Sequence, residues 1–282
     1  MTESPASAGV LYLVATPIGN LEDITARAIR ILKEVDLIAA EDTRVTRKLL
    51  AHFDIHTPLT SFHEHTAAAK SDALLAKLTG GASLALVSDA GTPCVSDPGA
   101  EFVASAAAAG IRVEPIPGAC AAIAGLIASG LPTGRFVFEG FLPRAKSERQ
   151  ERLREVLRET RTIIFYEAAN RLVETLEELR KTVGETRHVT VGREITKRFE
   201  EFRRGTLAEV AAHYRENSPR GECVILLEGA AERPPDEPEY DLDALIQAAL
   251  NAGQSARDIS RELATKTGMP KNEVYTRIQQ LL

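Results

Sequence analysis

Short apolar runs alternate with helically spaced apolar positions along the first half of the chain. The runs are short enough for buried strands and lie at residues 10–15, 36–40, 59–62, 83–87 and 111–116. Helical spacing occurs between them, at residues 24–35, 46–53, 67–78 and 100–109. Asp23 is the expected cap of the first of these helices. This alternation predicts a mainly parallel sheet covered by helices.

The pattern continues beyond a proline-glycine hinge at residues 115–118. An alanine- and glycine-rich helix is expected at residues 119–129. Further strands are predicted at residues 136–141, 162–166, 189–193 and 223–227, with an additional antiparallel strand at 199–204. Helices are predicted at residues 147–159, 172–182 and 207–214. We therefore expect α/β domains at residues 9–116 and 117–231.

The C-terminal segment differs from both halves. Residues 232–239, ERPPDEPE, form a proline-rich acidic linker. Residues 240–282 predict a small helical module, whose spacing resembles a helix-turn-helix. Five acids and five bases balance within it, which speaks against an autonomous DNA reader and favours a packing or dimer-supporting tail.

Composition limits the functional class. The 282 residues are 44% hydrophobic and 26% charged, which is ordinary for a globular protein, and no apolar run reaches the roughly 18 residues of a membrane span. The N-terminus lacks the features of a signal peptide. The three cysteines form no pair with disulfide or zinc-ligand spacing, so a cytoplasmic protein without a structural metal is expected. The net charge of −6 argues against indiscriminate nucleic-acid binding, although it allows a local basic surface.

Three glycine- and proline-containing loops follow predicted strands, at residues 16–20, 88–99 and 115–122. Ligands of open α/β sheets bind beyond the carboxyl ends of the strands, although ordinary turns use the same residue types. The second loop offers Asp89, Ser96 and Asp97, with Gly91 and Gly99 for close approach of a ligand. Neither GxxxxGK[ST] nor GxGxxG is present. Acidic and small residues suit a sugar hydroxyl, an adenine edge or a cationic centre.

Taken together, TPIGNLEDI…AEDTR, SDAGTPCVSDPG and PIPGACAAIAG resemble the tetrapyrrole-methylase superfamily, the class III S-adenosylmethionine-dependent methyltransferases. EGFLPR, FYEAANRL and VGREITKRFEE are similar to its ribosomal RNA branch, and the resemblance extends from residue 9 to about residue 229. It implies two α/β domains with the cofactor in the cleft between them, usually as a homodimer. It also implies 2′-O-methylation of a cytidine ribose in the decoding centre of 16S ribosomal RNA.

The resemblance assigns the residues that hold S-adenosylmethionine. They are Pro17 and Gly19 in the first loop, Asp89, Ala90, Gly91, Thr92 and Pro93 in the second, Pro117 and Gly118 in the third, and Tyr166, Glu167 and Glu194 in the second domain. Two segments depart from the family pattern. Residues 168–170 are Ala-Ala-Asn where Ser-Pro-His is expected, and residues 119–121 are Ala-Cys-Ala where Pro-Ser-Ala is commoner. Adenosine contacts at the second segment are therefore expected to be backbone or apolar.

A ribose hydroxyl attacks more readily when a nearby base takes its proton. The candidates for that base are Glu41, Asp42, His63 and Glu64, all after predicted strands. The alternatives are a helix cap for the first two, surface positions for the others, or no base at all.

Recognition of RNA requires polar and cationic contacts. Asn20 is placed to orient the ribose, and Arg44, Arg144 and Lys146 are the candidate phosphate ligands. A solvated helix laced with ion pairs is the alternative for the segment after Arg144. Two other functions stay open: methylation of a tetrapyrrole or another small acid, and a non-enzymatic ribosome-assembly factor. The acidic AEDTR and SFHEHT stretches favour RNA over a carboxylate-rich tetrapyrrole.

Overall fold

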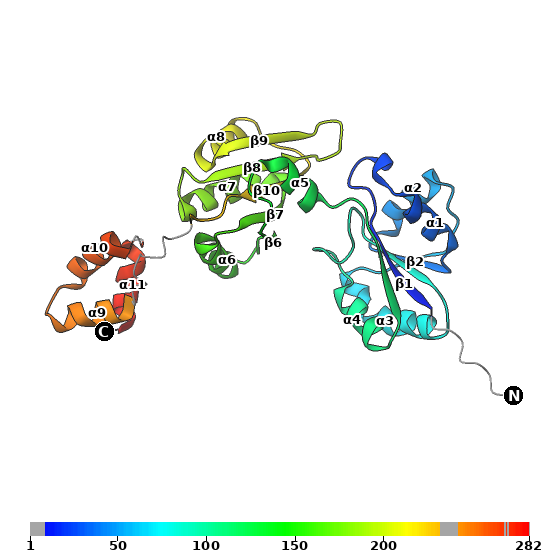
Figure 1. Cartoon of the computed structure of the whole chain (residues 1–282), viewed down its shortest axis with the longest axis horizontal. Helices are drawn as coiled ribbons and strands as arrows, with labels where there is room; N and C mark the ends of the chain where they lie inside the picture. The colour runs from blue at the N-terminus through cyan, green and yellow to red at the C-terminus, as the bar shows by residue number, and fades with distance from the viewer. Residues whose placement is uncertain (1–8, 232–241, 268, 270, 282) are drawn as a thin grey trace. The chain divides into compact units, whose positions relative to one another are not determined.

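A computed structural model of the chain describes residues 9–231, 242–267, 269 and 271–281 (Figure 1). The chain divides into two compact units, one up to residue 230 and one from residue 231 onward. The first unit contains two five-stranded sheets, and the second contains helices. This confirms the predicted fold class of two α/β sheets with C-terminal helices, whereas the domain boundaries proposed from the sequence stay predictions.

The first sheet is entirely parallel, in the order β3-β2-β4-β1-β5. Its strands are β1 (Val10–Val14), β2 (Leu37–Ala40), β3 (Leu59–Ser61), β4 (Leu84–Val87) and β5 (Arg112–Ile116). The helices between them are α1 (Ala26–Glu34), α2 (Thr43–His52), α3 (Glu64–Thr79) and α4 (Ala100–Ala108). Buried side chains of α1 and α2 share one core and those of α3 and α4 another, so the helices cover opposite faces (Figure 1). The predicted alternation is confirmed.

The start of the first helix differs from the prediction. Leu21–Asp23 forms a short 3₁₀ turn, η1, and α1 begins three residues later. Thr25 is the cap, because its hydroxyl accepts the backbone N–H of Ala28 at 3.0 Å. The expected capping role of Asp23 is therefore wrong, and its carboxylate instead accepts the hydroxyl of Thr196.

The second sheet is mixed, in the order β6-β7-β10-β8-β9. Its strands are β6 (Phe136–Phe141), β7 (Thr162–Ala168), β8 (His188–Arg193), β9 (Glu201–Thr206) and β10 (Glu222–Leu227). Only β6 and β7 pair in parallel, and β9 is antiparallel to β8, as predicted. Its helices are α5 (Ala121–Ser129), α6 (Lys146–Arg158), α7 (Ala169–Val183) and α8 (Leu207–Glu216).

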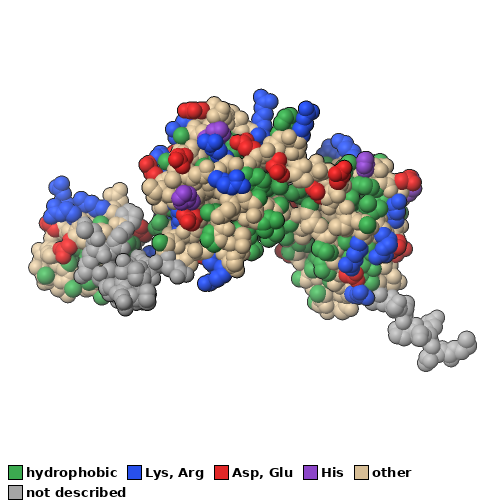
Figure 2. All heavy atoms as spheres, turned by 45° about the horizontal axis from the view of Figure 1, so that its top comes forward, with side chains coloured by type: hydrophobic (Ala, Val, Ile, Leu, Met, Phe, Trp, Pro, Cys, Tyr) green, Lys and Arg blue, Asp and Glu red, His purple; other side chains and the backbone are tan. Residues whose placement is uncertain are grey.

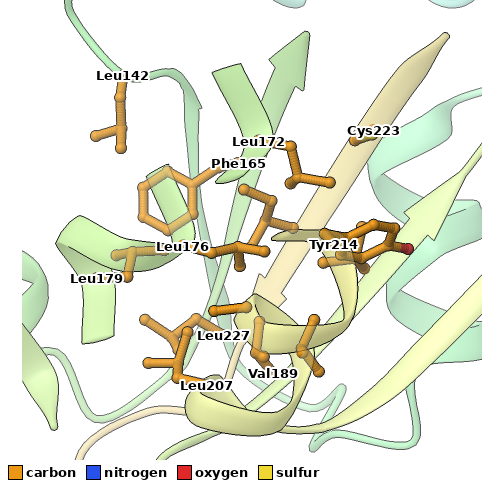
Figure 3. Close-up of a cluster of buried hydrophobic side chains, with 14 of the residues drawn as sticks. Leu142, Phe165, Leu172, Leu176, Leu179, Val189, Leu207, Tyr214, Cys223 and Leu227 are labelled. Carbon is orange, nitrogen blue, oxygen red and sulfur yellow. The ribbon is translucent and has the colours of Figure 1, made fainter. Parts of the chain in front are cut away.

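Two apolar cores hold the second sheet. Phe165, Leu172 and Tyr214 belong to the core that joins the sheet to α6, α7 and α8 (Figure 3). On the other face, Leu126 of α5 packs with Ile164 and Leu226. The C-terminal ends of β6, β7 and β8 and the first turn of α5 are thereby fixed, and these parts contribute to the site from the second sheet.

The second unit consists of α9 (Leu242–Asn251), α10 (Ala256–Thr267) and α11 (Lys271–Leu281). Its core contains Ile246, Ile259 and Val274, and Arg277 donates two hydrogen bonds to Asp243. The helical module is confirmed, while the predicted linker at 232–239 lies outside the described residues. Within the described residues, no helix has the length and apolarity needed to cross a membrane.

Candidate active site

Hydrogen bonds join the first and second predicted loops. The N–H of Thr16 donates to the carbonyl of Gly91 at 2.9 Å, and the N–H of Gly91 donates back at 3.0 Å. The Thr16 hydroxyl also donates to the carbonyl of Ser88 at 3.2 Å. Gly91 has a φ of +85°, in the region that favours glycine, and a Cβ there would lie 3.1 Å from Cγ2 of Ile18. The two loops therefore form one rigid rim.

The third loop adjoins the same rim. The hydroxyl of Thr92 donates to the carbonyl of Ala119 at 3.1 Å. A Cβ on Gly118 would lie 3.0 Å from the Cβ of Ala15, so this position allows only a minimal side chain. The carboxyl ends of β1, β4 and β5 thus bring all three loops together, as the sequence predicts.

A cavity of about 360 Å³ opens beside these loops. Eight of the predicted site residues line it: Glu41, Asp89, Ala90, Gly91, Thr92, Tyr166, Glu167 and Glu194. The first five lie in the loops after β2 and β4 of the first sheet. Tyr166 and Glu167 belong to β7 of the second sheet and Glu194 follows β8, so both halves of the first unit contribute.

Other residues line the cavity as well, and of these only Ser96 and Asp97 of the second loop were singled out from the sequence. Ile18, Val95, Cys120, Ala121, Phe141 and Ile195 supply apolar surface, and Asp97 and Lys197 add charge. Most of them lie inside the quoted motifs, but no single-sequence signal distinguishes a side chain that faces a cavity from its neighbour in the same loop.

The remaining predicted cofactor residues lie outside the lining: Pro17, Gly19, Pro93, Pro117 and Gly118. Gly19 illustrates their place. A Cβ there would lie 2.3 Å from Cγ of Lys197, which belongs to the loop between β8 and β9. Such a residue shapes the loop beside the cavity, and direct cofactor contact by these five residues stays a prediction.

Two carboxylates of the cavity are fixed by the backbone. The N–H of Asp42 donates to Oδ1 of Asp89 at 2.8 Å, and the N–H of Asp89 donates to Oε2 of Glu41 at 3.3 Å. Burial raises the pKa of Glu41 and also that of Asp89, against the lowering effect of these hydrogen bonds. These hydrogen bonds therefore connect the loop after β2, which carries Glu41, to the loop after β4, which carries Asp89.

A third carboxylate lies in the same cavity. Burial raises the pKa of Asp97 to about 6, and the negative charges of Glu41 and Asp89 contribute to the increase. A hydrogen bond with the Ser88 side chain acts in the opposite direction. Asp97 can therefore change its protonation state close to neutral pH.

Asp42 and His63 are not among the residues that line the cavity. Asp42 caps α2, accepting the N–H of Arg44 at 2.8 Å, which confirms the capping alternative. Its carboxylate also pairs with the exposed Arg44 guanidinium. His63 precedes α3, and its N–H donates to the hydroxyl of Thr66 at 3.2 Å. The side chain of Glu64 lies outside the described residues.

The RNA candidates differ in their freedom. The Asn20 side chain accepts the N–H of Glu22 at 3.1 Å, so it stabilises the turn before α1. Arg144 and Lys146 are exposed between β6 and the start of α6. The segment that carries them follows directly from Phe141, at the cavity lining.

Tyr166 connects the second sheet to the third loop. Its hydroxyl accepts the N–H of Ala122 at 3.1 Å, in the first turn of α5. Burial raises its pKa to about 12, so the hydroxyl stays protonated at neutral pH. Rings of Phe138 and Phe141 meet its ring edge-on, at centroid distances of 5.0 and 5.7 Å.

Glu167 is only 2% exposed and is held by its own domain. Its carboxylate accepts the N–H of Ala168 at 2.9 Å and the hydroxyl of Thr175 at 2.7 Å. Arg171 is its ion-pair partner at 3.4 Å. These contacts fix the turn from β7 into α7 at the cavity wall.

A charged cluster formed by Lys197, Glu194 and Glu222 also lines the cavity. Nζ of Lys197 donates to Glu194 and to Glu222, each at 2.9 Å. Glu194 and Thr196 have positive φ values of 52° and 67°, and Ser96, which lines the cavity, has one of 65°. Non-glycine residues in this conformation collect at functional sites. Among the described residues, no group of three His, Cys, Asp or Glu is placed to hold a metal ion.

Comparison with known proteins agrees with this geometry. The family model for tetrapyrrole (corrin/porphyrin) methylases matches residues 10–211. A protein of Synechocystis named ribosomal RNA small subunit methyltransferase I is 50% identical over 270 residues, 95% of this chain and 96% of its own length. The protein of the same name from Halalkalibacterium halodurans is 49% identical over 271 residues, 95% of this chain and 93% of its own.

A solved structure shows the same fold. It is the uroporphyrin-III C-methyl transferase from Thermus thermophilus, complexed with S-adenosylhomocysteine. Its TM-score is 0.55 at 23% identity, over 78% of this chain and 97% of that one.

Proposed function

Because the chain belongs to the tetrapyrrole (corrin/porphyrin) methylase family, we propose that it transfers a methyl group from S-adenosylmethionine to 16S ribosomal RNA. The acceptor is the 2′-oxygen of a cytidine ribose in the decoding centre. The observation that carries the proposal is the near full-length identity of 50% with a small-subunit RNA methyltransferase. The cavity supports it, since its carboxylates suit a ribose better than a carboxylate-rich tetrapyrrole.

The residues present fit the methyl donor. Its sulfur is positively charged, and Glu41, Asp89 and Asp97 line the cavity. An adenosine is bound by apolar surface and by backbone that it can approach closely. Ile18 supplies the first, and Gly91, which has no side chain, supplies the second. When bound, S-adenosylmethionine supplies a methyl group that reacts with nucleophiles without a metal. The complex of the Thermus methyltransferase with S-adenosylhomocysteine is consistent with a related donor in this cavity.

The chain's own residues would orient the ribose and receive its proton. Of the four base candidates, Glu41 lines the cavity, but one of its oxygens accepts a backbone N–H. Asp97 lies in the same cavity, and its pKa of about 6 leaves it mainly ionised at neutral pH. We therefore propose Asp97 as the proton acceptor, with Glu41 as the charge that helps to raise its pKa.

The basic segment after β6 would hold RNA phosphates. Figure 2 shows acidic and basic side chains interspersed on the face in view, in keeping with a net charge of −6. Binding of a folded RNA would then depend on a few cations beside the cavity and on shape. Exposed Arg144 and Lys146 are the cations closest in sequence to the lining residue Phe141.

Replacing both Arg144 and Lys146 with alanine is expected to weaken binding of small ribosomal subunits about ten-fold or more at low salt. The slope of the logarithm of affinity against the logarithm of salt concentration should decrease by about one for each phosphate contact removed. Filter binding over a salt series measures both quantities, and calorimetry with S-adenosylmethionine should show unchanged donor affinity.

Arg158→Ala is the matched control, because this exposed arginine lies at the far end of α6. It should bind subunits nearly as wild type does. Equal losses of donor and RNA affinity in the double variant would assign the segment a structural role.

We propose further that the protein acts in the cytoplasm as a homodimer. Ile123 and Ile127 of α5 are 43% and 72% exposed, which is unusual for neighbouring large apolar residues on one helix. A second copy of the chain covering this face would remove them from water.

A further inference from the structure

Phe141 is an exposed aromatic side chain at the cavity. It is 53% exposed, although it lines the cavity together with Tyr166. Phe141 is not buried and belongs to none of the described hydrophobic cores, so core packing does not explain an aromatic residue at this position. Large exposed apolar side chains at a cavity mark ligand contacts.

The backbone conformation of β6 sets the position of this ring. The pairing of β6 with β7 shifts register between Phe138 and Gly140, so the strand carries a bulge. Gly140 has a φ of +63°, and a Cβ there would lie 3.0 Å from the hydroxyl oxygen of Ser96. The bulge therefore turns the end of β6 against the second loop and places Phe141 at the cavity.

The residues in contact with the Phe141 ring or next to it in sequence are themselves held in place. On one side the Tyr166 ring contacts it edge-on at 5.7 Å, and the Tyr166 hydroxyl is itself held by Ala122. The next residue, Leu142, is 2% exposed and acts as an anchor in the core. A rigid aromatic surface loses little conformational entropy when a flat ligand stacks on it.

Two arginines, one buried and one partly buried, hold the following loop through its carbonyl groups. Arg171 donates to the carbonyl of Leu142 at 3.1 Å, and Arg149 to that of Pro143 at 3.5 Å. Arg149 is 6% exposed, and it also donates to the hydroxyl of Thr175 at 2.8 Å. The loop that carries Phe141 and the exposed Arg144 is therefore fixed from below by the core of its own domain.

An exposed aromatic ring followed after three residues by an exposed arginine suits single-stranded RNA. Bases stack on aromatic faces whatever their sequence, while a nearby cation holds the phosphate. We propose that Phe141 is the stacking surface for the base of the nucleotide whose ribose enters the cavity. The base is thereby unstacked from its RNA neighbours, and Arg144 holds the adjoining phosphate. This inference rests on the proposed RNA substrate.

A fluorescence experiment tests this contact directly. The chain contains no tryptophan, so Phe141→Trp places its single tryptophan at the cavity, and this fluorophore can be excited selectively over the five tyrosines. Titration with small ribosomal subunits, in the presence of S-adenosylhomocysteine to prevent turnover, should quench this fluorophore saturably. Phe136→Trp is the matched control, because Phe136 is 39% exposed at the opposite end of the same strand and does not line the cavity.

Kinetics provide an independent measurement. Phe141→Leu keeps an apolar side chain but removes the ring, and it should raise KM for subunits about ten- to hundred-fold while donor affinity is unchanged. Phe141→Tyr should restore a KM close to that of the wild type. Equal quenching at positions 136 and 141, or equal KM values for the leucine and tyrosine variants, would overturn the inference. Wild-type methyl transfer to subunits is measured in parallel, and its absence would instead contradict the proposed function.

Discussion

Gly91→Leu is expected to abolish methyl transfer and to lower donor affinity at least about 100-fold. Gly91 lines the cavity at a φ of +85°, and even a Cβ would lie 3.1 Å from Ile18. A leucine side chain therefore has to occupy the cavity or displace the rim formed with Thr16. Excluding the donor from a preformed pocket removes most of its binding free energy, and about 2.7 kcal/mol already corresponds to 100-fold.

Calorimetry with S-adenosylmethionine measures the donor affinity, and circular dichroism monitors the fold. Gly110→Leu is the matched control, since Gly110 has a φ of +75° but nothing within 4 Å of its Cβ position. Both variants put a side chain on a backbone of similar positive φ, and only Gly91→Leu changes the cavity. Wild-type donor affinity in Gly91→Leu would remove the second loop from the donor site.

Asp97→Asn is expected to lower kcat about 100-fold or more, because an amide cannot accept the proton of a ribose hydroxyl. The wild-type kcat should fall as the pH decreases through about 6, where Asp97 becomes protonated. The variant should lose this step in its pH profile. Single-turnover methyl transfer from labelled donor to subunits, between pH 5 and 8.5, measures both effects.

Stability measurements separate a catalytic from a structural role for Asp97. A folded-state pKa of about 6 against an ordinary value of 3.8 means that the folded state binds this proton more tightly than the unfolded state. Ionised Asp97 therefore opposes folding above pH 6, and this penalty vanishes below about pH 4. Asp97→Asn should raise the free energy of unfolding at pH 7.5 by about 1–3 kcal/mol. Lower stability at pH 7.5 together with unchanged kcat would refute the assignment.

Much of the fold follows from local patterns. Residues 83–87 lie within one residue of β4, which is buried and apolar throughout. Residues 111–116 lie within one residue of β5, an edge strand that also contains Arg112 and Glu114. The convergence of the three loops also follows, since the carboxyl ends of parallel strands lie at the same edge of the sheet.

The one error has a local cause, whereas two omissions depend on contacts between residues distant in sequence. The capping role given to Asp23 was wrong because a 3₁₀ turn intervenes and Thr25 supplies the capping hydroxyl. Lys197 reaches the cavity through its ion pair with Glu222, 25 residues away. Phe141 reaches it through a bulge, which an apolar strand pattern does not reveal.

The central claim is best tested by methyl transfer from labelled S-adenosylmethionine to small ribosomal subunits, followed by mass spectrometry of the nucleosides. The account predicts a single product, 2′-O-methylcytidine, from 16S ribosomal RNA. Tight donor binding without incorporation into any RNA would contradict it and would favour a tetrapyrrole substrate or a non-enzymatic assembly factor.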